Sequence, residues 1–396
     1  MNNLFEPKFL PGNQITLLRG GQAYFPALVL AIDAATQTVY LQTYIFELDN
    51  AGITVGSALK QAALRGVSVN VLLDGFGAKD MPNSYKKELE NAGVQLMFYR
   101  PKISPWTLKK NRLRRMHRKI AVIDNKQAFV GGINIIDDYN VPDNTPPRID
   151  YAVRIEGALL PRIATSVTKL WQHMAFRRFN GPTFYAASQT LTKTAHAENK
   201  LNSAGMRAAF VLRDNVVNRY AIESAYLDAI NNARSEIIIA NAYFVPGRRF
   251  RVALLNAAKR GVQVELLLQG RMEYFLMFAT HAFYSLFLKN GIHIFEYRKS
   301  FMHCKVAVID GYWSTVGSSN IDPFSMMLAR EANIIVEDSA FAKDLRNEIV
   351  NNIRLGACRV DANQWLAGNR IKRGVSWLVY ALVRVSLGII GHSNER

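Results

Sequence analysis

The feature that most constrains this chain is a nine-residue motif that occurs twice with the same internal spacing. The first copy runs from Met116 to Asp124 and the second from Met302 to Asp310. Each copy reads His-x-Lys, four residues, Asp, six further residues, and then Gly-(Gly/Ser)-x-Asn. A chain that repeats such a pattern is expected to contain two copies of one structural unit.

The apolar run inside each copy predicts a buried strand, which ends in a hairpin turn at Asp124 in the first copy and at Asp310 in the second. Side chains two apart on a strand point to the same face, so each copy places an imidazole beside an ammonium group. The pairs are His117 with Lys119 and His303 with Lys305. Such a pair suits phosphate chemistry, because the amine can bind a non-bridging oxygen while the imidazole attacks phosphorus or moves a proton. A solvated strand end would explain one pair, but two at matching spacing favour a catalytic site. At a turn, a structural role for the aspartates is favoured over a catalytic one, and both stay open.

Similar segments precede both motifs in the same order, which extends the repeat. The matching ranges are 31–35 with 229–233, 39–44 with 237–242, 62–75 with 257–270, and 93–99 with 291–297. Strands that alternate with helices predict an α/β half with a largely parallel or mixed sheet. We expect a first half over 1–182, a linker over 183–204, a second half over 205–360 and a C-terminal segment over 361–396. Pseudo-symmetry between the halves would bring His117 and His303 together.

The doubled motif resembles that of the phospholipase D superfamily, and the likeness extends from about Gln14 to Arg354. Within the superfamily the chain looks most like the bacterial cardiolipin synthases of the B type. The resemblance implies a duplicated α/β/α sandwich with the active site between two pseudo-symmetric halves. It also implies phosphatidyl transfer between two phosphatidylglycerol molecules, which gives cardiolipin and glycerol. A hydrolase of the same superfamily, either a phospholipase D or a nuclease, is the main alternative. A binding module without activity is a weaker one, because both His-x-Lys pairs are intact.

The resemblance also assigns roles to residues. One histidine, for which we choose His117, attacks phosphorus to form a phosphatidyl-enzyme, and His303 protonates the leaving alkoxide and later deprotonates the incoming hydroxyl. The groups expected to hold the phosphate oxygens are Lys119, Lys305, Asn134, Asn320 and Ser318. Family members orient each histidine with a downstream carboxylate, and Asp150 and Glu331 lie at plausible positions in the strands after the two motifs. The chain departs from the common pattern at Gly132, where a serine is usual, so the two halves should be chemically unequal. No metal or cofactor is expected, because the lysines supply the positive charge.

The net charge of +18 and the pI of about 9.9 favour a polyanionic partner, either nucleic acid or an anionic lipid surface. Seven cationic residues lie between 100 and 116, in a segment that is much shorter in the second half. We expect a headgroup clamp there, although basic residues around an aromatic would also suit single-stranded nucleic acid. The expected contacts are Trp106, Arg112, Arg114 and Arg115. The two cysteines, Cys304 and Cys358, fit a reducing compartment. Cys304 alternates with the motif residues and is expected in the core.

Two apolar segments favour lipid over nucleic acid. The aromatic-rich range 272–288 predicts a helix that is either buried or in contact with acyl chains. The range 375–390 is nearly continuous apolar sequence, but it falls short of the roughly 20 residues that span a bilayer.

A narrow polar stripe recurs every four residues through the second of these segments, at Ser376, Tyr380, Arg384 and Gly388. With Trp377 and cationic residues before it, the segment predicts a helix that lies in the headgroup plane, while a helix docked on the second half is the alternative. The N-terminus shows no signal-peptide pattern. We therefore expect an anionic phospholipid substrate and a peripheral or monotopic enzyme on the cytoplasmic face of a bacterial inner membrane. The sequence does not predict the oligomeric state.

Overall fold

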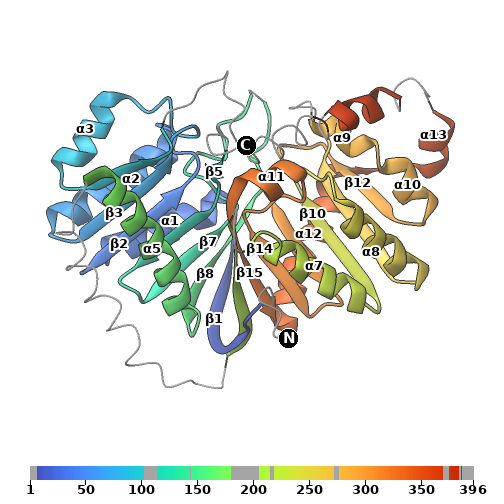
Figure 1. Cartoon of the computed structure of the whole chain (residues 1–396), viewed down its shortest axis with the longest axis horizontal. Helices are drawn as coiled ribbons and strands as arrows, with labels where there is room; N and C mark the ends of the chain where they lie inside the picture. Colours follow the sequence, from blue (N-terminus) through green and yellow to red (C-terminus); the bar gives the residue numbers. More distant parts are fainter. Residues whose placement is uncertain are drawn as a thin grey trace, which may run out of the picture.

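The structure is a computed structural model that describes residues 7–101, 114–142, 144–179, 205–214, 218–271, 276–368, 374–382 and 385. It is an α/β protein in which helices cover the faces of a large sheet (Figure 1). Two sets of elements follow one another along the chain in nearly the same order.

The first set runs from the N-terminal region to α5. Its elements are β1 (Leu10–Arg19), α1 (Gly20–Asp33), β2 (Thr38–Thr43), α2 (Asn50–Leu64), β3 (Ser68–Asp74), α3 (Asn83–Asn91), β4 (Gln95–Tyr99), β5 (Arg115–Met116), β6 (Lys119–Ile123), β7 (Gln127–Gly131), β8 (Tyr151–Gly157) and α5 (Leu160–Phe179).

The second set repeats this order with small additions. Its elements are β9 (Met206–Arg213), α7 (Ala221–Asn232), β10 (Glu236–Asn241), α8 (Arg248–Lys259), β11 (Gln263–Gln269), α9 (Leu276–His281), α10 (Tyr284–Lys289), β12 (His293–Tyr297), β13 (Lys305–Ile309), β14 (Trp313–Gly317), α11 (Pro323–Leu328), β15 (Ala329–Glu337), α12 (Ser339–Gly356), β16 (Ala357–Arg359) and α13 (Ala362–Ala367). The predicted duplication and mixed α/β class are confirmed.

The strands of both sets form one 16-stranded sheet. Its order is β16-β12-β11-β10-β13-β14-β15-β9-β1-β8-β7-β6-β2-β3-β4, and β5 pairs with β15 outside this path. Strands β2, β3 and β4 are parallel, whereas β6 is antiparallel to β2, and the second half repeats this arrangement. The halves are joined where β1 pairs with β9. The sheet is therefore mixed in each half and continuous across the molecule.

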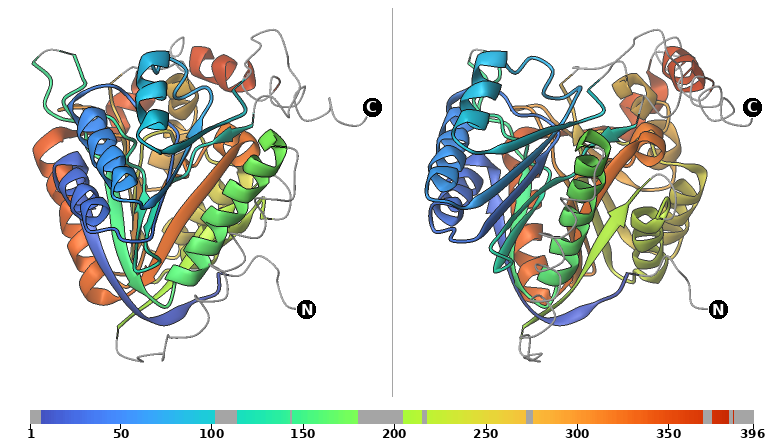
Figure 2. Two further views of the ribbon diagram at one scale, coloured as in Figure 1. Left: turned by 90° about the vertical axis from the view of Figure 1, so that its left-hand side faces the viewer. Right: turned by 60° about the vertical axis from the view of Figure 1, so that its left-hand side comes forward.

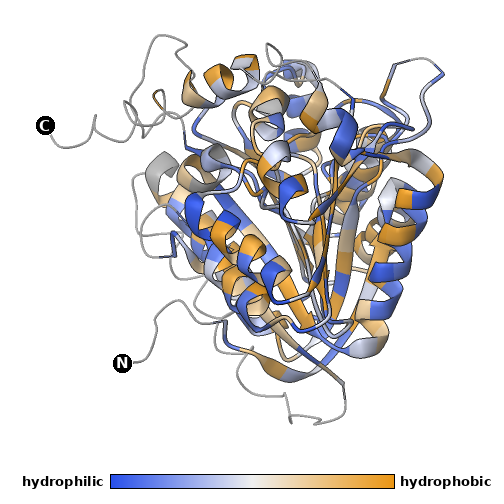
Figure 3. Ribbon diagram, turned by 90° about the vertical axis from the view of Figure 1, so that its right-hand side faces the viewer, coloured by the Kyte–Doolittle hydropathy of each residue, from blue (hydrophilic) through white to orange (hydrophobic). Residues whose placement is uncertain are grey.

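Three hydrophobic clusters fill the space between the sheet and the helices. One lies under α1, α2 and α3 of the first half, and one under α7, α8 and α10 of the second. The third takes buried residues from both halves, including Val153, Val167, Val306 and Leu345. Figure 1 shows the two halves side by side, Figure 2 shows them from two further directions, and Figure 3 shows hydrophobic residues on the strands between the flanking helices. The halves thus share a core as well as a sheet.

The motif strands β6 and β13 end in tight turns, as predicted. Asp124 and Asn125 have φ of 50° and 52°, and Asp310 and Gly311 have φ of 52° and 60°. Two consecutive residues with positive φ are typical of a type I′ hairpin turn, which Asp, Asn and Gly tolerate best. The turn lies at the far end of the strand from the histidine.

The aromatic-rich segment is part of the second core. The prediction of one continuous helix is wrong, because α9 ends at His281 and α10 begins at Tyr284. The side chains of Phe283, Tyr284 and Phe287 are 1% exposed and pack in the cluster under α7 and α8. The described part of this segment is therefore buried, which is the first of the two roles left open, and not in contact with acyl chains.

The C-terminal segment forms a further helical stretch over residues 374–382. Within the described residues, no helix combines the length and the apolar character needed to cross a membrane. Ser376 and Val379 are buried, whereas Trp377, Leu378 and Leu382 are more than half exposed. The Tyr380 ring lies 4.8 Å from that of Phe283, so this side of the helix packs on the second half. The predicted polar stripe therefore begins on the protein-facing side together with Val379, whereas Val375, Trp377, Leu378 and Leu382 face outward.

Candidate active site

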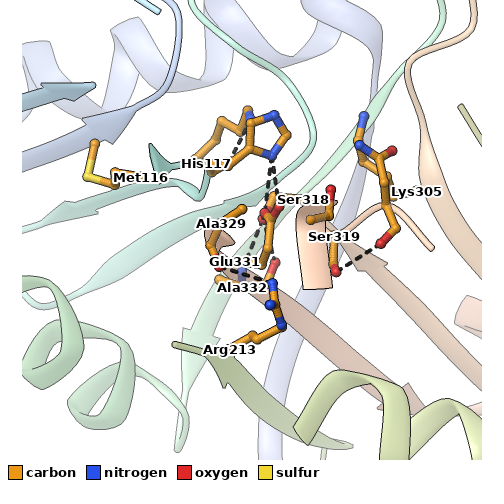
Figure 4. Close-up of polar contacts among 12 residues, drawn as sticks. Met116, His117, Arg213, Lys305, Ser318, Ser319, Ala329, Glu331 and Ala332 are labelled. Atoms are coloured by element: carbon orange, nitrogen blue, oxygen red, sulfur yellow. Dashed lines mark hydrogen bonds and ion pairs between the residues drawn. The ribbon is translucent and has the colours of Figure 1, made fainter. Parts of the chain in front are cut away.

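The two motif histidines are each held by the opposite half of the chain. Nδ1 of His117 donates a hydrogen bond to Oε1 of Glu331 at 3.0 Å (Figure 4), and Nδ1 of His303 donates one to Oδ2 of Asp150 at 2.7 Å. The carboxylates are 0% and 3% exposed, whereas the imidazoles are 16% and 24% exposed. A carboxylate on Nδ1 fixes the tautomer and leaves Nε2 as the free nitrogen. Each imidazole is thus held in place through Nδ1, and its Nε2 is available to a substrate.

The main chain makes the same exchange between halves. The amide of His117 donates to the carbonyl of Arg330 at 3.0 Å, next to β5, which pairs in parallel with β15. The amide of His303 donates to the carbonyl of Ile149 at 2.9 Å. Asp150 and Glu331, predicted as the orienting carboxylates, each follow one of these carbonyl groups in the chain. The tertiary pairing therefore brings each carboxylate to the histidine of the other motif.

Ser318 and Gly132 occupy equivalent positions but act differently. The Ser318 hydroxyl donates to Oε2 of Glu331 at 2.5 Å and accepts from the amide of Ala332 at 3.0 Å. Here the hydroxyl positions the carboxylate of Glu331, and its predicted bond to a phosphate oxygen stays a prediction. At Gly132, a Cβ atom would lie 2.3 Å from Oδ1 of Asp150. Glycine at this position makes room for the carboxylate that holds His303.

Two buried lysines complete the pairs. Nζ of Lys119 donates to the carbonyl of His117 at 2.6 Å, and Nζ of Lys305 donates to the carbonyl of His303. Burial lowers the pKa of Lys119 to about 7, although Glu331 opposes the shift, and burial also lowers the pKa of Lys305. Two partly desolvated ammonium groups beside the imidazoles are suited to bind an anion, whose charge would favour their protonated forms.

The two histidine–carboxylate pairs differ in their electrostatics. Burial raises the pKa of Asp150 to about 6, whereas the pKa of Glu331 is lowered because His117 and Lys119 outweigh its burial. Burial lowers the pKa of both imidazoles, and that of His303 falls well below its usual value because Lys305 and Lys119 add to the effect. Both imidazoles are therefore neutral near pH 7 before a substrate binds.

The motif aspartates lie away from this chemistry. The carboxylate of Asp124 accepts hydrogen bonds from the amides of Thr36, Gln37 and Thr38, and that of Asp310 accepts from Arg234, Ser235 and Glu236. Burial raises the pKa of each aspartate, but these bonds outweigh it and hold the pKa below the usual value. A five-residue strand separates each aspartate from its histidine, roughly 3.3 Å per residue. The favoured structural role agrees with this geometry, and the catalytic role does not.

The motif asparagines lie at the ends of β7 and β14 and are buried. Oδ1 of Asn134 accepts a hydrogen bond from the amide of Ile45 at 3.1 Å. Its NH₂ group, on the other side of the side-chain amide, remains the donor. Asn320 is 5% exposed. Their predicted role in phosphate binding stays a prediction.

Some residues around the site were not predicted. The Tyr44 ring lies 4.8 Å from the His117 ring and 5.4 Å from Nζ of Lys119. Arg213 donates to the carbonyl of Ala329 at 3.0 Å beneath Glu331 (Figure 4). Tyr44 immediately follows β2, and its counterpart in the second half is Ala242, so a comparison of the two repeats could have singled it out. Cys304 is 1% exposed in the shared core, as expected.

The predicted headgroup contacts are only partly described. Trp106 and Arg112 lie outside the described residues, whereas Arg114 and Arg115 lie at β5 immediately before the first motif. The Arg115 guanidinium lies 5.3 Å from the centre of the Phe76 ring. In the described part of the chain, no group of three or more His, Cys, Asp and Glu side chains could hold a metal ion.

Known proteins share this fold and much of this sequence. A family model described as "Cardiolipin synthase, PLD-like domain" matches residues 28–144 and 226–353. Cardiolipin synthase B of Escherichia coli (strain K12) is 39% identical over 351 residues, which cover 88% of this chain and 83% of the relative. The corresponding protein of Salmonella typhi is 40% identical over 339 residues, covering 85% and 80%. The crystal structure of phosphatidylserine synthase from Haemophilus influenzae has a TM-score of 0.69 at 15% identity and covers 95% of this chain and 94% of its own. That last likeness concerns the fold alone.

Proposed function

The chain belongs to the phospholipase D-like family of cardiolipin synthases, and we propose that its two halves together transfer a phosphatidyl group from one phosphatidylglycerol molecule to another. It is a phosphatidyltransferase of the phospholipase D superfamily. The observation that carries the proposal is the pair of histidines, each mounted on a carboxylate of the opposite half and flanked by a buried lysine.

In the first step, Nε2 of His117 attacks the phosphorus of one phosphatidylglycerol. A phosphorus–nitrogen bond forms and the bond from phosphorus to the glycerol oxygen breaks. His303, whose Nε2 takes up a proton when the anionic phosphodiester binds beside it, delivers that proton to the leaving glycerol. In the second step, a hydroxyl of another phosphatidylglycerol gives its proton to His303 and attacks phosphorus. The phosphorus–nitrogen bond then breaks, and cardiolipin leaves. Lys119 and Lys305 bind the non-bridging oxygens in both steps.

The choice of His117 as the nucleophile is supported by its carboxylate. Glu331 is held by Ser318 and keeps its charge, because its pKa is lowered. A fixed negative charge on Nδ1–H stabilises the positive imidazolium that forms when Nε2 bonds to phosphorus. Asp150 has a raised pKa and lacks a hydroxyl partner at Gly132, so it provides less of this stabilisation.

We further propose that the enzyme binds peripherally to an anionic membrane through the helix at 374–382. Its outward residues Val375, Trp377, Leu378 and Leu382 are 44–61% exposed, an apolar surface that water does not favour. This helix lies at the same end of the molecule as β5, which directly precedes His117 (Figures 1 and 2). The free thiols of Cys304 and Cys358 fit the cytoplasmic leaflet of a bacterial inner membrane.

The test is to incubate the purified protein with vesicles of phosphatidylglycerol that carries a label in its headgroup glycerol and another in its acyl chains. We expect cardiolipin and free glycerol in equal amounts, without added metal. Phosphatidic acid as the sole lipid product would show a hydrolase instead. Cleavage of single-stranded DNA with no lipid product would favour a nuclease.

A further inference from the structure

Tyr44 places an aromatic ring against the first His-x-Lys pair of the site. Its ring centre lies 4.8 Å from that of the His117 imidazole, with 60° between the two ring planes. Nζ of Lys119 lies over the face of the same ring, 5.4 Å from its centre. An aromatic face attracts a cation within about 6 Å. One ring therefore contacts both the imidazole and the ammonium group of the first motif.

The second half has no ring at the equivalent position. Strands β2 and β10 are equivalent, because each is antiparallel to the strand of its own motif. The residue that follows the strand is Tyr44 in the first half and Ala242 in the second. The Ala242 amide donates to the carbonyl of Cys304 at 3.0 Å, directly after His303 in the chain. The two histidines thus differ in the side chain that the repeat places beside them.

A buried carboxylate fixes the Tyr44 ring relative to His117. Oδ2 of Asp74 accepts from the amide of Met116 at 2.8 Å, directly before the histidine, and Oδ1 accepts from the amide of Gly77 at 3.3 Å. Gly77 packs closely on the tyrosine: a Cβ atom there would lie 2.1 Å from the Tyr44 carbonyl oxygen and 3.1 Å from Cδ2 of its ring. Asp74 is 0% exposed. The loop that supports the ring and the strand that leads into the histidine are therefore tied to one residue.

This arrangement is not a property of the repeated unit. Asp74 ends β3, whereas Gln269 ends the equivalent strand β11. Oε1 of Gln269 is buried without a hydrogen-bond partner among the residues that the structure describes. The duplicated core can thus be built without an acid at this position. The acid and the tyrosine occur together in the half that carries His117.

We propose that Tyr44 is a positioning residue that makes His117, and not His303, the nucleophile. This inference rests on the proposed function, in which one histidine bonds to phosphorus and the other moves protons. The Nε2 lone pair of His117 forms the bond to phosphorus, and the electron pair of the breaking phosphorus–oxygen bond leaves with the glycerol oxygen. The imidazole ring thereby becomes positively charged. The Tyr44 ring stabilises this charge and holds the Lys119 ammonium group beside the phosphate.

The other histidine has the opposite requirement. His303 must give its proton to the leaving glycerol, and an aromatic face beside it would stabilise the protonated imidazole and oppose the transfer. Ala242 has no such face. The pair of side chains therefore suits a nucleophile in the first motif and a proton donor in the second, and the reverse assignment would place each side chain beside the wrong histidine.

A series of fluorinated rings tests this charge effect with little change in size. Phenylalanine and its mono-, di- and trifluoro derivatives at Tyr44 weaken the negative potential of the ring face stepwise. With a phosphatidyl ester of p-nitrophenol, whose leaving group needs no protonation, the burst of nitrophenol reports bond formation at His117. We expect the rate constant of the burst to fall at each step, by about tenfold over the series. The same series at Tyr24, a buried ring that packs on Phe25 and Phe129, is the matched control and should leave the burst unchanged.

Two ordinary substitutions complete the test. Tyr44→Phe retains the ring face and should keep most of the wild-type burst rate. Tyr44→Leu keeps apolar bulk without a π face, and we expect it to lose at least as much as the trifluoro derivative. Thermal unfolding shows that each variant folds. A flat fluorine series, or a wild-type burst rate in Tyr44→Leu, would overturn the inference.

The variant His117→Ala separates a failure of this inference from a failure of the proposed function. If it abolishes the burst while the fluorine series is flat, His117 is the nucleophile but Tyr44 is not the reason. If it keeps the burst while His303→Ala loses it, the proposed assignment is itself wrong and the inference falls with it. The burst precedes the arrival of an acceptor. The result therefore holds whether the enzyme makes cardiolipin or only hydrolyses its substrate.

Discussion

Glu331 lies 214 residues after His117 in the chain, yet its carboxylate accepts the hydrogen bond from Nδ1 of that histidine at 3.0 Å. Asp150 makes the matching bond to His303 at 2.7 Å. Each half therefore supplies the nucleophilic or acid–base imidazole of one pair and the carboxylate of the other. The chemistry of the two histidines can be separated by substitutions, as the following predictions describe.

Activated leaving groups should distinguish the two histidines. With a phosphatidyl ester of p-nitrophenol, the leaving group needs no protonation, so His303→Ala should still release a burst of nitrophenol equal to the enzyme concentration. His117→Ala should give no burst, because no phosphorus–nitrogen bond can form. Rapid-mixing absorbance measures both. The reverse pattern would identify His303 as the nucleophile, and bursts from both variants would contradict the assignment of the nucleophile to one histidine alone.

The difference between Gly132 and Ser318 should appear as unequal effects of alanine. Gly132→Ala places a Cβ atom 2.3 Å from Oδ1 of Asp150, so the carboxylate must move and release His303, and we expect kcat to fall at least about 100-fold. Ser318→Ala removes one hydrogen bond to Glu331 and should cost about tenfold. Gly247→Ala is the control, since its Cβ meets only an ordinary contact at 3.7 Å. Thermal unfolding should show that all three proteins fold. Wild-type activity in Gly132→Ala would refute this account of the glycine.

The pH dependence of kcat/KM should be bell-shaped. The burial that lowers the pKa of Lys119 to about 7 means that its ammonium form is lost as the pH rises above that value, so activity should decline on the alkaline side. The burial that raises the pKa of Asp150 to about 6 means that it protonates below that value and no longer accepts from His303, which gives the acid limb. The parameter kcat/KM reports groups of the free enzyme. Initial rates at low substrate from pH 5 to 9 measure the profile.

A single substitution tests the assignment of the acid limb. Asp150→Asn cannot titrate, so its residual activity should lose the acid limb and keep the alkaline one. An acid limb that persists in this variant belongs to another group. A profile that stays flat to pH 9 in the wild type would mean that the Lys119 ammonium is not the titrating cation.

Membrane binding should depend on the outward face of the helix at 374–382. Leu378 is 61% exposed, and replacing it by Asp should weaken vesicle binding about tenfold or more, because burying a leucine is worth about 1.5–3 kcal/mol. Leu64→Asp is the matched control: Leu64 is 66% exposed at the C-terminal end of α2 and should not matter. Co-sedimentation with phosphatidylglycerol vesicles at high salt isolates the apolar part of binding. Equal sedimentation of both variants and the wild type would assign the helix a role within the protein only.

The sequence was sufficient to predict the repeat, because identical spacing around His117 and His303 is a local property. It also indicated Asp150 and Glu331 as orienting groups. The expectation that each histidine meets a downstream carboxylate is wrong for His303, which is held by Asp150 from earlier in the chain. The exchange depends on contacts between the halves, such as the pairing of β5 with β15. The commitment of the Ser318 hydroxyl to Glu331 has the same origin.

Other features depend on packing that no single segment encodes. The break between α9 and α10 lets Phe283 enter the core, whereas the apolar pattern of that segment is compatible with one continuous helix. The predicted boundaries of the halves and of the linker at 183–204 stay predictions, and that linker lies outside the described residues.

The exchange of carboxylates between halves limits how such an enzyme can diversify. If one half existed alone and paired with a copy of itself, the two-fold axis would generate two identical histidine–carboxylate pairs, and any substitution would alter both at once. When the two copies are joined on one chain, a substitution alters only one of the two pairs. A glycine can then stand opposite a serine, and an isoleucine opposite an arginine, while each half still supplies what the other lacks. A symmetric ancestor could break a phosphodiester, but only a fused one can give its two sides different substrates.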